Sequence, residues 1–183
     1  MIGNMRLYWQ SKIFALLHDP VFKPFALDKA KADLWRELDV MQDWQDIPAD
    51  GKLLNYLRNA DYVSAASDRT SISSINSQLN YDEDQGLEIS HLLSGAKQQL
   101  KGSDRQTLVN KEQELLLAIE HETDPQKVFW WLWRCLPIEA CRGSDQHNSL
   151  LLMPADPSIP DISLWSHTSM TAALAGASIG WHQ

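Results

Sequence analysis

Residues 52–68 constrain the fold of this chain more than any other stretch, because their apolar and small side chains recur every three or four positions. This spacing places them on one side of a helix, which predicts a helix packed against a core. Asp61 lies on that side. Because an unpaired buried carboxylate is costly, we expect Asp61 either to accept hydrogen bonds from the backbone or to bind a cation. The repeat consists of Leu53, Leu54, Leu57, Asp61, Ser64, Ala65 and Asp68.

Two histidines and a second aspartate are further candidates for a cation site. His18 and Asp19 stand at the end of a helix predicted over residues 6–18. His167 falls in the first turns of a helix predicted to start near Ser163, after a proline-rich connector. Imidazole and carboxylate ligands together favour Mn, Ni, Co or Fe, with Mg as the alternative, and an ion of this kind can activate water.

Each of these side chains also has a purely structural interpretation. His18 and Asp19 can simply end a helix, with the aspartate acting as a neighbouring cap. His167 can be a core histidine that forms a hydrogen bond with Asp156 or Asp161. The sequence by itself leaves these alternatives open.

The rest of the chain predicts a single, mostly α-helical domain over residues 1–183 with a long loop-rich middle. Further helical patterns cover residues 28–40, 111–122 and 126–136. Residues 70–110 are rich in Ser, Asn, Gln, Asp and Gly and have weak periodicity, so we predict a variable insertion with short elements there. The residues of the first of these helices expected to face inward are Leu34, Trp35 and Leu38.

The helix predicted over residues 126–136 is crowded with aromatic side chains. Asp124 is a suitable N-cap for it, with Pro125 at the first helical position. At helical spacing beside aliphatic side chains, the aromatic residues fit a core or a subunit interface better than base stacking. They are Phe129, Trp130, Trp131 and Trp133.

Composition excludes several classes of protein. No apolar run approaches the roughly 18 residues that a membrane helix requires, and no signal peptide precedes the first helix, so we expect a cytoplasmic protein and no membrane partner. The formal net charge of −8 argues against a free-standing domain that binds duplex nucleic acid by neutralising phosphates. Cys135 and Cys141 lack a metal-binding spacing, and we expect both to be free buried thiols.

Four stretches follow one another in an order typical of a known family. Residues 15–23 read Ala-Leu-Leu-His-Asp-Pro-Val-Phe-Lys, residues 60–69 contain Ala-Asp-Tyr-Val-Ser-Ala-Ala-Ser-Asp-Arg, and residues 90–95 read Ser-His-Leu-Leu-Ser-Gly. Residues 154–176, from Pro-Ala-Asp-Pro through Trp-Ser-His-Thr to Ala-Leu-Ala-Gly, are the most specific. Together they resemble the N-terminal HD domain of the large, polymerase-like subunit of type III CRISPR effector complexes, especially the Cmr (III-B) branch.

The resemblance implies a circularly permuted HD-type helical domain. In the common order of HD phosphohydrolases a lone histidine precedes the His-Asp pair, whereas here His18 and Asp19 come first and His167 last. It also implies that these three residues and Asp61 bind the metal, with His18 and Asp19 catalytic. Lys23 can contact the scissile phosphate or be a solvated surface lysine, and His91 can complete a second metal position or be a surface or structural residue. The other candidates near the site or the substrate are Asp68, Arg69 and Asp161.

The function that the resemblance implies is a metal-dependent nuclease that cleaves single-stranded DNA in antiviral defence when the assembled complex has bound target RNA. The implied partners are the other subunits of the effector and, through them, guide RNA and target RNA. The family's palm domains, with their Gly-Gly-Asp-Asp motif, have no counterpart here. We therefore expect this chain to be the HD portion of a longer protein.

Two other functions remain open at this point. HD chemistry serves phosphomonoesters as well as diesters, so an HD-type nucleotide phosphohydrolase is one alternative. The other is a non-catalytic assembly module whose helices dock onto neighbouring subunits.

Overall fold

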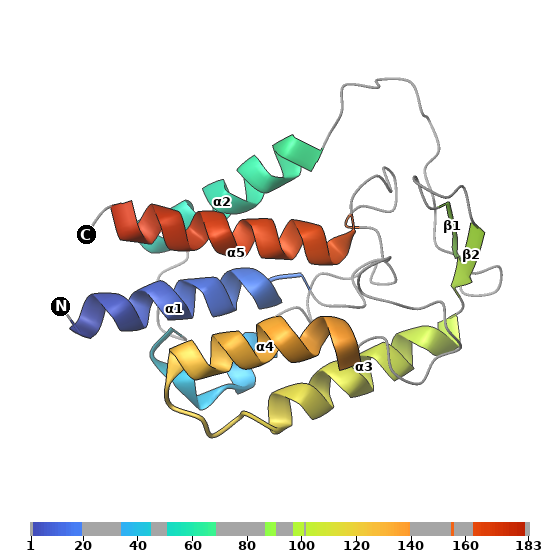
Figure 1. Cartoon of the computed structure of the whole chain (residues 1–183), viewed down its shortest axis with the longest axis horizontal. Helices are drawn as coiled ribbons and strands as arrows, with labels where there is room; N and C mark the ends of the chain where they lie inside the picture. Colours follow the sequence, from blue (N-terminus) through green and yellow to red (C-terminus); the bar gives the residue numbers. More distant parts are fainter. Residues whose placement is uncertain are drawn as a thin grey trace.

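The computed structural model describes residues 2–19, 34–44, 51–68, 87–90, 97–100, 102–139, 155 and 163–181. This part of the chain is mostly α-helical, which confirms the prediction of a mostly helical domain (Figure 1). The α-helices are α1 (Ile2–Leu17), α2 (Lys52–Asp68), α3 (Gly102–Leu117), α4 (Pro125–Glu139) and α5 (Leu164–Trp181). Two short 3-10 helices, η3 (Leu34–Glu37) and η4 (Asp39–Trp44), and an antiparallel pair of strands, β1 (Leu87–Ser90) and β2 (Lys97–Leu100), complete the described elements.

Helix α1 lies at the centre of this arrangement. α5 runs antiparallel along it, and α4 packs against it as well (Figure 1). α2 packs mainly on α5, and α3 packs on α4. Apolar side chains from α1, α3, α4 and α5 therefore share one core. Its buried members include Ile13, Leu16, Leu17, Leu116, Phe129, Leu132, Ala172 and Ala175.

Small side chains allow α1 and α5 to approach closely. A methyl group added at Gly176 of α5 would lie 3.0 Å from Cδ of Lys12 and 3.1 Å from Cε2 of Tyr8, both on α1. The Lys12 ammonium in turn lies over the rings of Tyr8, Trp9 and Phe129, at 4.5 to 5.3 Å from their centroids. The absence of a side chain at Gly176 thus allows the two helices to pack closely.

The N-termini of α4 and α5 lie where the sequence predicts them. Asp124 caps α4, since its Oδ1 accepts a hydrogen bond from the backbone N–H of Gln126 at 2.9 Å. Ser163 caps α5, since its Oγ accepts a hydrogen bond from the backbone N–H of Ser166 at 3.1 Å. The second cap matters for the site, because it fixes where the first turn of α5 begins.

Several predicted helix bounds differ from the structure. α1 begins at Ile2 rather than at residue 6, and α4 extends to Glu139 rather than to residue 136. Of the helix predicted over residues 28–40, residues 28–33 lie outside the described part. Over residues 34–44 the chain forms η3 and η4 rather than an α-helix, with Leu38 N–H bonded to the Trp35 carbonyl and Met41 N–H to the Leu38 carbonyl. Their apolar side chains are nevertheless buried as expected. α3 begins at Gly102, nine residues before the predicted start at 111. The prediction missed these first turns because they are too polar to show an apolar stripe.

The aromatic residues of α4 divide between the core and the surface. Phe129 is buried against Trp9, and Trp133 packs on Trp165 with ring centroids 5.1 Å apart, which confirms a core role for both. Trp130 and Trp131 remain exposed, so their assignment to a subunit interface stays a prediction. The thiol of Cys135 is free as expected, but the residue is only partly buried, and Cys141 lies outside the described residues.

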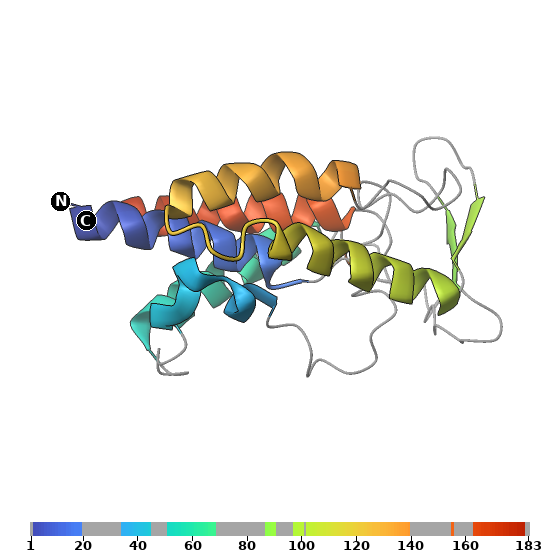
Figure 2. The same ribbon diagram turned by 90° about the horizontal axis from the view of Figure 1, so that it is seen from below.

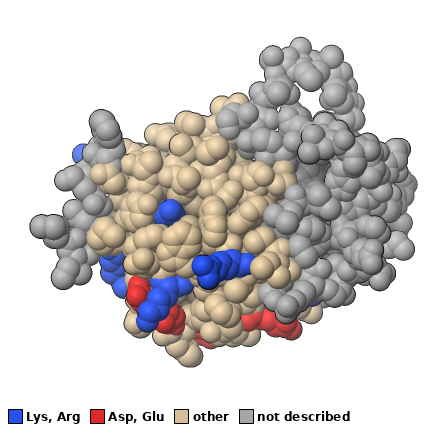
Figure 3. Space-filling model, in the orientation of Figure 1, with Lys and Arg blue, Asp and Glu red and all other residues tan. Residues whose placement is uncertain are grey.

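Charged side chains are unevenly distributed over the described surface. α5 contains no Asp, Glu, Lys or Arg, and the surface over α5 and α1 is accordingly almost free of charge, whereas acidic and basic side chains gather along the edge below (Figure 3). None of the described helices is both long enough and apolar enough to cross a membrane.

Candidate metal centre

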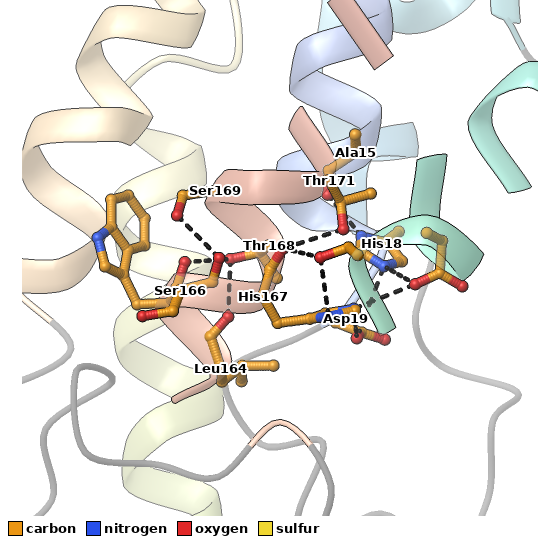
Figure 4. Close-up of polar contacts among 12 residues, drawn as sticks. Ala15, His18, Asp19, Leu164, Ser166, His167, Thr168, Ser169 and Thr171 are labelled. Carbon is orange, nitrogen blue, oxygen red and sulfur yellow. Dashed lines mark hydrogen bonds and ion pairs between the residues drawn. The ribbon is translucent and has the colours of Figure 1, made fainter. Parts of the chain in front are cut away.

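Three helices bring the four predicted ligands together. His18 and Asp19 directly follow the last residue of α1, Asp61 lies in the middle of α2, and His167 lies in the first turn of α5 (Figure 4). His18, Asp19 and His167 each present a ligand atom within 4.8 Å of the others. Asp61 Oδ1 lies 3.3 Å from Nε2 of His18 and 3.1 Å from Nε2 of His167. Residues distant in the sequence thus form one cluster.

The end of α1 orients the ring of His18. Its Nδ1 lies within hydrogen-bond distance of the Ala15 carbonyl, one turn earlier in the chain. Because a carbonyl oxygen can only accept, Nδ1 carries the hydrogen. Nε2, the nitrogen that faces Asp61 and Asp19, is then free to present its lone pair to a cation.

Ser64 of α2 orients the second ring. Its hydroxyl donates to the His167 carbonyl at 3.2 Å and lies 3.3 Å from Nδ1 of the same residue. Because a hydroxyl has one hydrogen, its oxygen accepts from Nδ1–H of His167. Thr171 also donates to the His167 carbonyl, at 2.9 Å. With its one hydrogen on Nδ1, His167 carries a lone pair on Nε2, and this atom faces Asp61, as Nε2 of His18 does.

The cluster requires positive charge. With neutral rings, two nitrogen lone pairs face carboxylate oxygens: Asp61 Oδ1, and Asp19 Oδ2 at 3.6 Å from His18 and 3.5 Å from His167. Such contacts between acceptors are stable only with a proton or a metal ion between them. When both rings also carry a hydrogen on Nε2, hydrogen bonds from His167 and then His18 hold the pKa of the Asp61 carboxyl far below its usual range, although burial opposes this. Asp61 is therefore ionised.

The spacing of His18, Asp19 and His167 fits a single divalent metal ion, and Asp61 lies beside both imidazoles. Ligand atoms about 2.1 Å from one ion are separated from their neighbours by about 3.0 Å in an octahedral site and about 3.4 Å in a tetrahedral one. The four contacts between imidazole nitrogens and carboxylate oxygens measure 3.1 to 3.6 Å. Two imidazoles with two carboxylates suit Mn, Fe, Co or Ni.

The four ligands differ in their access to solvent. The side chain of His167 is 5% exposed, whereas that of Asp61 is 36% exposed. His18 and Asp19 lie between these values, at 16% and 13%. The cluster therefore opens to solvent on the side of Asp61 and α2.

Several predicted residues are not placed by the structure. Lys23, Arg69, His91 and Asp161 lie outside the described residues, and Asp68 is described only as the last residue of α2. Sequence reasoning also missed a contributor: Ser64 stood on the predicted inward side of its helix, but nothing in the sequence linked it to His167.

Comparisons with known proteins found no relative: no family model matches the sequence, and neither the curated proteins nor the solved structures include a match.

Proposed function

We propose that this chain is a metal-dependent HD-type phosphodiesterase domain that cleaves single-stranded DNA within a type III CRISPR effector complex once target RNA is bound. The observation that carries the proposal is the cluster of His18, Asp19, Asp61 and His167. These four residues occupy the positions that the resemblance assigns to metal ligands, and they come from three separate helices.

The chain's own residues would prepare the reaction as follows. The hydrogen bonds from the Nδ1 atoms to Ala15 and Ser64 hold both imidazoles with Nε2 toward the centre. The carboxylates of Asp19 and Asp61 would supply the negative charge that retains a cation. A bound divalent ion supplies Lewis acidity, which lowers the pKa of water and offsets charge on the leaving oxygen of a phosphodiester.

The arrangement of the helices supports a circularly permuted HD domain. The helix with the lone histidine, α5, lies antiparallel beside α1, which ends at the His-Asp pair. The amino end of α1 and the carboxyl end of α5 lie at the same end of the bundle (Figure 2). Joining these ends and opening the chain elsewhere would restore the common order, with the lone histidine before the pair.

Partner subunits are part of the proposal. With a net charge of −8, the chain needs basic surfaces from elsewhere to hold the backbone of long DNA. The exposed Trp130 and Trp131 on α4 are the type of side chain that protein interfaces cover. We therefore propose that other subunits of the effector complete the DNA path and connect the site to guide RNA and target RNA.

The test compares two double variants in cleavage of labelled single-stranded DNA with Mn, in the presence and absence of chelator. His18→Ala with Asp19→Ala should abolish cleavage and leave the helical circular dichroism unchanged. The matched control is His121→Ala with Asp39→Ala, a second His-Asp pair joined at 3.0 Å on the surface, which should leave cleavage unchanged.

The outcomes separate the alternatives. Cleavage retained by the His18/Asp19 variant sinks the nuclease assignment. Consumption of dNTPs with intact DNA would indicate a nucleotide phosphohydrolase. No cleavage by the domain, followed by none in the reconstituted complex with target RNA, would indicate the assembly module.

A further inference from the structure

The opening of the metal centre limits how a substrate can reach it. His167 is almost fully buried and Asp61 is the most exposed of the four ligands. Of the described elements, α2 therefore offers a phosphodiester an approach along the exposed flank on which Asp61 lies. The side chains one turn or less from Asp61 on that flank decide which molecules can approach.

Arg58 stands one helical turn before Asp61. Positions three apart on a helix have Cβ atoms about 5–6 Å apart, so the two residues are neighbours on the surface of α2. Arg58 is exposed and has no hydrogen bond or ion pair with any residue that the structure describes. Among the described side chains of α2, Asp61 is the only acidic one. Arg58 thus carries a positive charge on the exposed surface of α2 near Asp61, and no ion pair joins it to a described carboxylate.

Tyr62 directly follows Asp61 and lies one turn after Arg58. Its side chain is 66% exposed, the highest value among the large apolar and aromatic residues in the described part of the chain. The pair at positions i and i+4 lies on one face of the helix. Burial in the core does not account for this aromatic ring, and no described residue bonds to its hydroxyl.

We propose that Arg58 and Tyr62 form the substrate-binding flank of the metal centre. Arg58 binds a phosphate next to the scissile one, because a guanidinium matches phosphate oxygens with two parallel N–H donors. Tyr62 stacks on the base of the same nucleotide. Stacking needs an unpaired base, so this flank selects single strands over duplexes. The inference rests on the proposed function and adds the residues that recognise its substrate.

The first measurement is binding, made with chelator so that no cleavage occurs. A short fluorescein-labelled oligothymidylate is titrated with the whole chain and followed by anisotropy at several salt concentrations. We expect Arg58→Gln and Tyr62→Leu each to weaken binding about tenfold. Arg58→Gln should also reduce the slope of log K against log salt by about 0.7, the value for one phosphate of a single strand.

Three controls separate recognition from structure. Arg134→Gln removes an exposed arginine from α4, and it should leave the affinity and the slope unchanged. Arg58→Lys should keep the slope, because the charge remains, and Tyr62→Phe should keep the affinity, because the ring remains. With Mn present, Arg58→Gln should raise KM about tenfold and change kcat less than about twofold, since uniform binding is lost.

The outcomes for this inference and for the proposed function differ. If the wild-type chain cleaves DNA but the α2 variants bind it normally, the inference is overturned and the proposed function stands. If the wild-type chain binds DNA through Arg58 and Tyr62 but does not cleave it in any state, the proposed function is overturned and the inference about these two residues stands. Equal affinity for duplex and single strand overturns the stacking role of Tyr62. Absence of DNA binding overturns the binding role of both Arg58 and Tyr62.

Discussion

Replacing Ser64 by alanine tests how the metal centre is assembled, because Ser64 is neither a ligand nor exposed to substrate. Its hydroxyl accepts from Nδ1–H of His167 and donates to the carbonyl of the same residue, and the side chain is fully buried. Ser64→Ala leaves the packing volume nearly unchanged. It removes the acceptor that holds the imidazole with Nε2 toward Asp61.

Two magnitudes follow from this geometry. Leaving a buried N–H without its acceptor costs about 1–3 kcal/mol in the free energy of unfolding. Loss of a hydrogen bond that orients a ligating histidine typically weakens metal affinity about 10- to 100-fold, which corresponds to about 1.4–2.8 kcal/mol. In the presence of Mn, the variant should therefore lose the stability of the unpaired N–H and, in addition, the stabilisation that corresponds to its weaker Mn binding.

The assay combines Mn titration by calorimetry with urea unfolding in the presence and absence of Mn. The control is Ser169→Ala, which removes a hydroxyl that donates to the Ser166 carbonyl on the same helix and does not bond to either histidine. The control should retain the wild-type Mn affinity. If Ser64→Ala lowers stability equally with and without Mn, and its Mn affinity equals that of the wild type, the orienting role of Ser64 is refuted.

Two further predictions concern stability. Gly176→Ala should be at least about 1 kcal/mol less stable than Gly180→Ala. The methyl group added at Gly176 meets Lys12 at 3.0 Å, whereas the one added at Gly180 meets nothing within 4 Å and raises helix propensity. Urea unfolding measures the stability of both variants, and equal stabilities would contradict the close α1–α5 contact. The hydrogen bond to Asp39 raises the pKa of His121 above its ordinary 6.5, so the stability from this ring is complete below pH 6.5 and is lost as the pH rises through the raised value. His121→Gln should therefore lower Tm below pH 6.5, and this difference should shrink as the pH rises through the raised pKa; a difference independent of pH would exclude this ion pair.

Sequence patterns predicted α2, the start of α5 and the cap of α4 well, because each carries a strong local signal. The apolar repeat of residues 52–68 and the capping residues Asp124 and Ser163 act within a few residues of themselves. The predictions were wrong where local signals are weak or compete. The first turns of α3 are polar and therefore give no apolar stripe. The apolar residues of η3 and η4 are buried, but the chain there forms 3-10 turns instead of an α-helix.

The candidate site divides in the same way. Its residue types could be predicted, since a carboxylate on an apolar stripe and a His-Asp pair at a helix end are unusual by themselves. The ring orientations could not, because they depend on hydrogen bonds between helices that are distant in the sequence. The pairing of Ser64 with His167 joins residues 103 positions apart.

The sequence alone determined that this chain is mostly helical and that His18, Asp19, Asp61 and His167 stand at the ends or on the inward sides of its helices, because periodicity and capping are local properties. Only the tertiary structure decided that these four side chains meet at one point with their Nε2 and carboxylate atoms 3.1 to 3.6 Å apart. The physical reason is that such distances depend on how helices pack across the core. The approach of α5 to α1 over small residues, and the contact of α2 with α5, place the ligands in one cluster.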